Sequence, residues 1–433
     1  MSWEPKFKQT EIGMIPEDWE VKEIQNVGEV IGGGTPSTKN KHYWDGKIAW
    51  ITPKDLSNHK SRYVKNGERN ITEEGLRQSS AKILPKGAVL LTTRAPVGYL
   101  AIAENEVTTN QGFHSIIPKE NTTTLFLYYL LKRNVEYLKS NASGTTFGEL
   151  SGSRLKSLKF SFPSLIEQQT IAKILSGFDS KVELNQRMIR SLEAVGQAVF
   201  KRWFVDFEFP NEEGKPYKSS GGEMVYNPDL DKEIPEGWNV KPIDEIANFL
   251  NGLALQKFPA RDGEEYLPVV KIRELRQGIT ESSDRANLDL PEEYVVNDGD
   301  VLFSWSGSLE VVIWGFGKGA LNQHLFKVTS SKYSKWFFYY WIVQYLPEYR
   351  QIAAGKATTM GHIQRHHLRA SQVIVPDDKT LERMDRLLAP IFERIGRIKV
   401  ETRILSELRD LLLPKLMSGK IRVPVARENE EAS

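Results

Sequence analysis

Residues able to contact nucleic acid gather in the non-helical stretches of this 433-residue chain. Asparagine and glutamine can pair bidentately with adenine, and arginine and lysine with guanine. Serine, threonine and backbone amides suit phosphate oxygens. The candidates in the first half are Lys39, Lys41, Lys54, Thr93, Arg94, Asn110, Gln111, Thr145 and Thr146. Those in the second half are Lys271, Arg273, Ser304, Ser306, Gln323, Lys356, Thr358, Thr359, His362 and Arg365. Asparagine, threonine and glycine are also common turn residues, so a purely structural role is the alternative for each.

Motifs for catalysis and cofactor binding are missing from the sequence. The glycine run at 32–34 lacks the third glycine and the later acidic residue of a dinucleotide fingerprint. Gly355-Lys356 is followed by Ala357, not by the serine or threonine of a phosphate-binding loop. The Asn/Asp-Pro-Pro-aromatic tetrapeptide of an amino-methyltransferase does not occur, and neither Pro-Asp pair (228–229, 376–377) has the acidic-x-Lys partner of a nuclease. We therefore expect no catalytic residue and no cofactor bound by this chain.

The histidines near position 365 have two further interpretations. His362 and His366 are four residues apart and could share a helix face that binds a metal, with His367 beside them. No third ligand is evident, and two neighbouring arginines would crowd a cation. We favour a basic surface for phosphate contact over a metal site, with a plain solvated face as the alternative.

Composition restricts the class of protein. Hydrophobic residues make up 40% and charged residues 26% of the chain, which is typical of a globular protein. The net charge is only +2, so any basic surface must be local or supplied by partner subunits. There is no cysteine, no signal peptide and no apolar run long enough to span a membrane. We expect a cytoplasmic protein without membrane contact.

The elements that must position the candidate residues occur twice. The octapeptide at 15–22 recurs at 234–241, and Lys86-Gly87-Ala88-Val89-Leu90 matches the pentapeptide at 298–302. The Asn-Gln pair at 110–111 matches that at 322–323. The offset falls from 219 to about 212, so the second copy lacks several residues between the counterparts of Ile24 and Lys86. A repeated frame with different loop residues predicts two readers of different short sequences.

Each copy ends in a helix with a heptad pattern. Eight of ten residues in the 4-3 series from 171 to 203 are apolar, as are eight of ten in the series 213 residues later, which predicts a coiled-coil seam. The predicted seam comprises Ile171, Leu175, Phe178, Val182, Asn185, Ile189, Leu192, Leu388, Ile391, Ile395, Ile398, Leu405 and Leu412. Asn185 and Thr402 are polar members of the kind that fixes register. Pro390 either kinks the second helix or begins it, and Pro414 should end or bend it.

The resulting fold class is α+β, a tandem duplication of a globular domain plus a long helix, with the two helices in an antiparallel coiled coil. Short β-type runs at 86–91, 100–103, 115–118, 300–305, 311–314 and 325–329, and aromatic-rich helices at 125–137 and 336–345, indicate mostly antiparallel sheets. The predicted boundaries are domain 1 at 11–163, a central helix at 164–207, a linker at 208–231, domain 2 at 232–375, a C-terminal helix at 376–421 and a disordered tail at 422–433.

The sequence resembles the specificity subunits of type I restriction-modification systems. The resemblance rests on the Ile-Pro-x-x-Trp opening of each copy, the Asn-Gln pair and the helix entry Pro-x-x-x-Glu-Gln-Gln-x-Ile-Ala at 163–172, and it extends from about 11 to 421. It implies two target-recognition domains that each read one half of a split double-stranded DNA site. It also implies helices that act as a spacer and dock methyltransferase subunits, which restriction subunits join. The second helix entry, Pro376-Asp377-Asp378-Lys379-Thr380, departs from the pattern, so docking there is less secure.

The resemblance implies that S-adenosylmethionine, ATP and magnesium bind the partner subunits and not this chain. Two alternatives remain open at this point. One is a stand-alone methyltransferase or nuclease that carries such domains, and the missing cofactor motif argues against it. The other is a coiled-coil scaffold without a DNA role, which the different loop residues on a shared frame disfavour.

Overall fold

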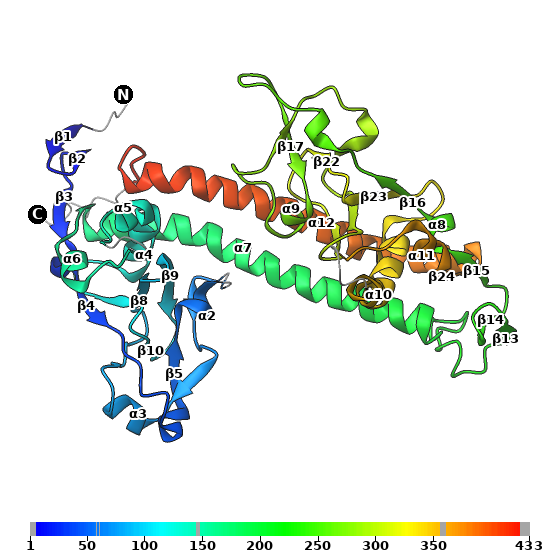
Figure 1. Ribbon diagram of the computed structural model, residues 1–433, viewed down its shortest axis with the longest axis horizontal. Helices are drawn as coiled ribbons and strands as arrows, with labels where there is room; N and C mark the ends of the chain where they lie inside the picture. Colours follow the sequence, from blue (N-terminus) through cyan, green and yellow to red (C-terminus); the bar gives the residue numbers. More distant parts are fainter. Residues whose placement is uncertain (1–5, 58, 60, 144–147, 356–360, 425–433) are drawn as a thin grey trace, which may run out of the picture. The chain divides into compact units, whose positions relative to one another are not determined.

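The structure, a computed structural model, describes residues 6–57, 59, 61–143, 148–355 and 361–424. The chain divides into two compact units (Figure 1). Unit 1 comprises 1–183 with 405–433, and unit 2 comprises 184–404. Each unit therefore contains one globular domain together with part of both long helices, whereas the sequence predicted the helices as separate segments.

Unit 1 is built on a five-stranded sheet whose strands are antiparallel except for one pair at its edge. Its order is β4 (Gly28–Gly32), β11 (His114–Pro118), β8 (Val89–Thr93), β9 (Val97–Ala103) and β6 (Tyr63–Val64), with β6 parallel to β9. A second sheet has the order β10 (Thr108–Thr109), β5 (Trp44–Ile51) and β7 (Arg69–Ile71). Two antiparallel pairs are β1 (Phe7–Thr10) with β2 (Gly13–Pro16), and β3 (Glu20–Glu23) with β12 (Lys159–Phe162).

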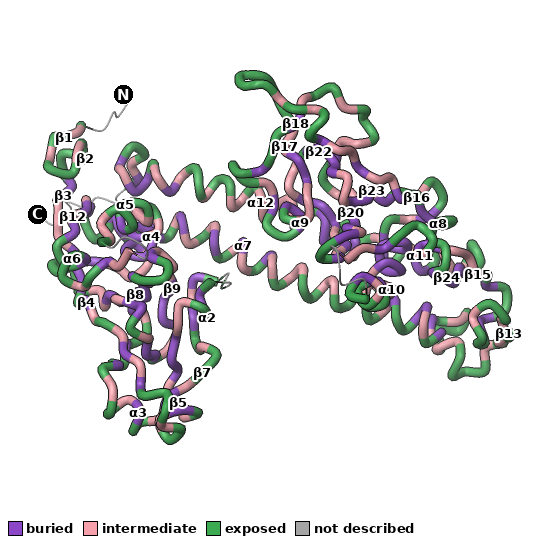
Figure 2. Tube along the Cα trace, in the orientation of Figure 1, coloured by how far each residue is buried: buried purple, intermediate pink, exposed green. Residues whose placement is uncertain are grey.

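Apart from its parts of the two long helices, unit 1 has short helices, and α4 with ten residues is the longest of them. They are α1 (Ile24–Val27), η1 (Lys41–Tyr43), α2 (Pro53–Ser57), α3 (Glu73–Arg77), α4 (Thr124–Arg133), α5 (Val135–Ser140) and α6 (Gly152–Ser157). The single helix predicted at 125–137 is divided at Asn134, whose side-chain Nδ2 donates to the Leu130 carbonyl at 2.7 Å. Asparagine favours such local hydrogen bonds over helix continuation. Helix α4 buries a continuous run at 126–131 in the core (Figure 2).

Unit 2 repeats this architecture with four strands in its main sheet and four in its second sheet, in place of five and three. Its main sheet has the order β16 (Asn248–Asn251), β23 (Leu325–Thr329), β20 (Val301–Ser304) and β21 (Val311–Ile313). The second sheet has the order β18 (Arg285–Ala286), β17 (Leu267–Val270), β22 (Gly319–Leu321) and β19 (Val295–Val296). Two further antiparallel pairs are β13 (Met224–Asn227) with β14 (Lys232–Pro235), and β15 (Asn239–Pro242) with β24 (Gln372–Val375). The helices are α8 (Ile243–Ile246), η3 (Leu255–Lys257), α9 (Ile272–Gln277), η4 (Glu292–Tyr294), α10 (Lys335–Ala354) and α11 (Arg365–Ala370).

The predicted linker at 208–231 contains folded structure. Strand β13 lies within it and pairs with β14 at the start of the second domain. Phe209 is buried and stacks on Trp238, with ring centroids 4.7 Å apart. The high content of glycine, proline and charged residues gave no indication of this structure, because one buried aromatic side chain can hold an otherwise polar segment in place.

The two long helices are α7 (Leu165–Phe200), extended by the π-helical turn η2 (Lys201–Val205), and α12 (Asp378–Met417). Helix α12 continues past both Pro390 and Pro414, so Pro390 does not begin it and Pro414 does not end it. Within the described ranges, none of the helices combines the length and hydropathy needed to span a bilayer.

In each unit the two long helices run antiparallel. In unit 1, Asp179 of α7 contacts Arg409 of α12 at 2.5 Å. In unit 2, Asn185 Nδ2 donates to Glu401 at 3.2 Å, and Glu193 lies 3.6 Å from Lys399.

The residues of the predicted seam differ in burial. The buried members are Ile171, Leu175, Val182, Asn185, Leu388, Ile395 and Ile398, and the partly buried ones are Phe178, Ile189, Leu192, Ile391, Leu405 and Leu412.

Candidate nucleic-acid interface

Two loops among the candidate residues are held by equivalent hydrogen bonds in both domains. The amide of Gly34 donates to the Thr109 carbonyl, and the amide of Leu253 donates to the Leu321 carbonyl at the equivalent positions of the second copy. A Cβ on Gly33 would lie 2.0 Å from the Asn110 carbonyl oxygen. These close approaches hold the loop after β4 against the Asn-Gln turn. Glycine is needed at position 33 because no side chain fits there.

The Asn-Gln pair is a turn whose two residues have different tasks. Asn110 Oδ1 accepts from the amide of Gly112 at 2.9 Å, and Asn322 Oδ1 accepts from the amide of His324 at 3.3 Å. Both are Asx turns, in which the asparagine side chain shapes its own backbone. The glutamine that follows is exposed at Gln111 and half-buried at position 323. The asparagines thus fix the turn, and the glutamines are the side chains it presents.

The hydroxyl side chains of the neighbouring hairpin loop also match between the domains. Thr92 Oγ1 donates to the Pro96 carbonyl, and Ser304 Oγ donates to the Ser308 carbonyl, each at 2.7 Å. The amide of Thr93 donates to the Gly112 carbonyl at 2.8 Å, so this hairpin adjoins the Asn-Gln turn.

Three sequence-predicted contacts are corrected by burial. Thr93, Ser304 and Ser306 are buried, and their hydroxyls are hydrogen-bonded inside the protein. Thr93 Oγ1 lies 2.8 Å from His114 Nδ1, and burial lowers the pKa of that histidine. These side chains cannot touch DNA in this conformation, and they hold loops in place instead.

The cations of the first domain stand around this turn on exposed positions. Arg94 projects from the hairpin with 54% of its side chain exposed, 4.0 Å from Glu149. Lys39 is exposed on the loop that carries Thr35, whose hydroxyl donates to Gln111, and Lys41 is exposed where that loop enters η1.

Lys54, in α2, pairs with Glu68 at 2.7 Å, and that carboxylate raises the pKa of the lysine. This ion pair is exposed on both sides and contributes little to folding, so Lys54 can exchange its carboxylate for a phosphate at small cost.

The second domain replaces this open surface with a hollow of about 480 Å³. Lys271, Arg273 and Gln323 line it, which brings three sequence-predicted residues together. Arg273 is held in place by two partners, the fully buried Glu274 at 2.8 Å and the Ser282 carbonyl at 3.0 Å.

The hollow is a preformed basic recess, and sequence reasoning missed several of its members. The missed side chains are Gln256, Asp284, Arg285, Asn322 and His324. Asp284 pairs with Lys271, and Arg285 lies 4.5 Å from the ring centroid of Tyr266. Their positions depend on the pairing of β17 with β18, which no local pattern revealed.

His362 and Arg365 flank the same hairpin without forming a metal site. Position 362 forms an isolated bridge with Ser306, and α11 begins only at Arg365, so His362 and His366 do not share a helix face, in agreement with the preference against a metal site. Arg365 Nη2 donates to the Phe249 carbonyl at 3.3 Å. Across the part of the chain that is described, no three His, Cys, Asp or Glu residues are grouped to hold a metal ion. Thr145, Thr146, Lys356, Thr358 and Thr359 lie outside the described residues.

Two copies of one loop frame that present different side chains define a sequence-recognition protein. The chain belongs to the family of type I restriction-modification DNA specificity domains, whose model matches residues 16–194 and 235–410. It is a specificity subunit with two target-recognition domains, the recognition component of a restriction-modification complex and not its catalytic one. DNA and the modification and restriction subunits are its partners as a class.

Similar proteins cover nearly the whole chain. The Type I restriction enzyme MjaIX specificity subunit of Methanocaldococcus jannaschii is 41% identical over 97% of this chain and 98% of its own length. The EcoR124I/EcoR124II specificity subunit of Escherichia coli is 31% identical over 40% of this chain and 42% of its own length. A crystal structure of the type I S subunit from M. genitalium has a TM-score of 0.56 at 17% identity, covering 95% of this chain and 98% of that one, and shows the same fold.

Proposed function

We propose that each domain reads one half of a bipartite double-stranded DNA site through the loops around Gln111 and Gln323. The observation that carries this proposal is the shared turn: identical hydrogen bonds hold it in both domains, while its neighbours differ. Arg94 stands beside the turn in the first domain, and its counterpart Ser306 is buried in the second. Such a frame offers a different donor and acceptor pattern to each half-site.

The exposed cations would position the domains, and the glutamines and Arg94 would discriminate bases. Lys39, Lys41 and Lys54 are exposed and therefore suited to phosphate contact, which strengthens binding to any sequence. Arg94 and Gln111 carry the bidentate groups that read guanine and adenine. In the second domain, Gln323 and Arg273 share one hollow and would act together.

We also propose that α7 and α12 set the distance between the half-sites and dock methyltransferase subunits. A helix of 36 residues is about 54 Å long, and readers one DNA turn apart need roughly 35 Å between centres. Leu408 and Leu411 are exposed apolar residues on α12 and are candidates for this docking. S-adenosylmethionine, ATP and magnesium would then bind the partner subunits, and the complex would act on DNA in the cytoplasm.

Selection of bound sequences from a random DNA library tests the proposal. The purified chain, alone and with its methyltransferase subunits, should enrich a site with two fixed segments separated by unspecified bases. Enrichment of a single uninterrupted segment, or of no sequence with either preparation, would show that the two domains do not read separate half-sites.

A further inference from the structure

In unit 1, a short segment of the chain fills the space between the main sheet and α7. Strand β6 adds to the sheet edge parallel to β9, and the Ile102 amide donates to the Arg62 carbonyl at 2.7 Å. The Arg62 side chain is only 6% exposed. Its guanidinium donates to Ser180 Oγ at 2.7 Å and lies 3.4 Å from Glu183.

Among the residues that the structure describes, unit 2 shows no counterpart of β6. Strand β21 corresponds to β9, because Val301 pairs with Ile313 as Val89 pairs with Ile102. Among the described strands β21 has β20 as its only neighbour, so it is an edge of the sheet. The residues missing from the second copy fall in the region that supplies β6 in the first. An exposed sheet edge is a ready template for another strand.

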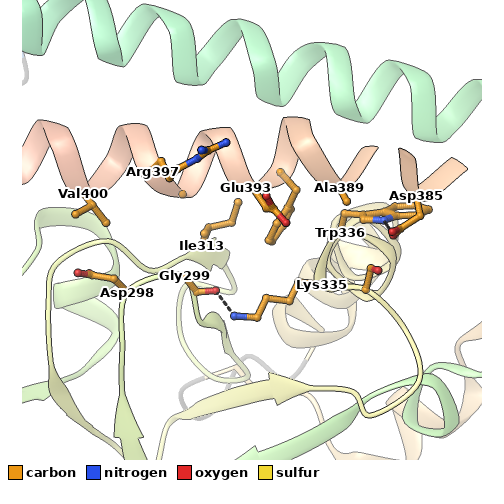
Figure 3. A pocket seen from close by; sticks show the side chains of 13 residues that line it. Asp298, Gly299, Ile313, Lys335, Trp336, Asp385, Ala389, Glu393, Arg397 and Val400 are labelled. Atoms are coloured by element: carbon orange, nitrogen blue, oxygen red, sulfur yellow. Dashed lines mark hydrogen bonds between the residues drawn. The ribbon is translucent and has the colours of Figure 1, made fainter. Parts of the chain in front are cut away.

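A cavity of about 700 Å³ lies in unit 2 where unit 1 holds Arg62 (Figure 3). In unit 1, Arg62 lies against residues 179, 180 and 183 of α7. The corresponding positions of α12 are Phe392, Glu393 and Gly396, and all three line the cavity. Ile313 of β21 lines the opposite wall. This volume is in the range of pockets that bind a ligand, about 300–1,000 Å³.

The side chains that line the cavity suit a segment like the one that contains Arg62 and occupies the corresponding space in unit 1. Its walls include the apolar side chains of Ile313, Trp336 and Phe392. Glu393 is exposed, and in the described part of the chain it has no ion pair or hydrogen bond. Asp385, by contrast, accepts from Trp336 Nε1 at 2.6 Å. Two cations also line the cavity: Lys335, which donates to the Gly299 carbonyl at 2.7 Å, and Arg397. The cavity thus has apolar walls with charges of both signs at its rim, and Glu393 is the carboxylate available to a further cation.

We propose that this cavity and the edge of β21 bind an extended, arginine-containing segment of a partner protein, which adds to the sheet as β6 does in unit 1. The backbone of the segment pairs with β21, and its arginine reaches Glu393. Strand addition supplies affinity through main-chain hydrogen bonds, and the side-chain pocket supplies selectivity.

Titration of the full-length chain with a labelled hexapeptide tests the proposal. The peptide copies residues 61–66, Ser-Arg-Tyr-Val-Lys-Asn, and the control peptide has glutamate in place of its arginine. We expect binding of one peptide per chain and slower hydrogen exchange of the β21 amides. The control peptide should bind about tenfold more weakly or worse, as when an interface anchor is lost.

Two variants place the binding in the cavity. Gly396→Leu fills it, since a Cβ there meets only Ile313 at 3.6 Å, an ordinary contact. Glu393→Lys reverses the charge. Both should weaken binding about tenfold or more. The matched control Gly177→Leu lies on an exposed part of α7 with open space around it and should bind as the wild type does.

Three outcomes would overturn the proposal. The first is no binding of the peptide at millimolar concentration, and the second is equal binding by Gly396→Leu. The third is a concentration-dependent dimer that Gly396→Leu abolishes, which would make a second copy of this chain the occupant. Selection of DNA sequences by Gly396→Leu should be unchanged, so a failure here is distinguishable from a failure of the DNA-reading proposal.

Discussion

At the residue scale, loss of the Arg94 or of the Gln323 side chain should impair recognition of one half-site and leave recognition of the other unchanged. Arg94→Ala removes an exposed bidentate donor beside the turn of the first domain. We expect loss of discrimination at one half-site by about 1–3 kcal/mol, with the other half unchanged. Gln323→Ala should do the reverse, so each variant is the control for the other. Competition binding against DNA with each half randomised measures both effects. Equal loss at both halves would assign Arg94 to a phosphate or to the fold.

The turn that presents Gln111 depends on Gly33 and should fail when that glycine gains a side chain. A Cβ at this position would lie 2.0 Å from the Asn110 carbonyl oxygen, so the backbone must move. Gly33→Ala should therefore abolish preference at the first half-site while binding to the second persists. Gly32→Ala is the matched control, because its Cβ would meet only His114 at 3.7 Å. If both variants select DNA as the wild type does, the shape of this turn is not what recognition depends on.

At the element scale, a buried charge network joins α7 to α12 in unit 1. Asp179 is almost fully buried, accepts from Tyr129 Oη at 2.6 Å and contacts Arg409 at 2.5 Å. Asp179→Ala leaves Arg409 partly buried without this partner and should lower the free energy of unfolding by about 3 kcal/mol. Asp410→Ala removes an exposed carboxylate from the same arginine and should cost less than about 1 kcal/mol. Urea denaturation measures both, and similar losses would contradict the network.

Heptad spacing predicted which face of each long helix is buried, because an apolar seam is a local pattern. The heptad spacing did not predict the buried ion pair of Asp179, because its partner Arg409 lies 230 residues away in the sequence. The candidate interface divides in the same way. Exposed cations and the two Asn-Gln turns were visible in the sequence, but the burial of Ser304 depends on pairing between β20 and its neighbours. The cavity beside β21 could not be predicted from the sequence, since the lack of a strand next to β21 leaves no sequence motif.

At the scale of the whole molecule, the end of the chain belongs to the same unit as its beginning. Arg422 bonds Glu167 at 2.9 Å and Asp18 at 2.6 Å, and Trp19 Nε1 also donates to Glu167. Arg422→Ala leaves the buried Glu167 carboxylate without its cation, so unit 1 should lose about 3 kcal/mol of stability. Lys420→Ala, at an exposed neighbouring position, should have little effect. Denaturant unfolding of the full-length variants measures the loss.

The same contact should make the stability of unit 1 sensitive to acid. Hydrogen bonding to Arg422 lowers the pKa of Asp18 below its usual value. A lowered folded-state pKa means that the contribution is complete above the unfolded pKa of about 3.9 and is lost as pH falls through the folded value. We therefore expect the stability difference between wild type and Arg422→Ala to be constant near neutral pH and to shrink below about pH 4. A difference that stays constant through that range would mean that Arg422 acts by packing and not by charge, because only the ionised carboxylates attract it.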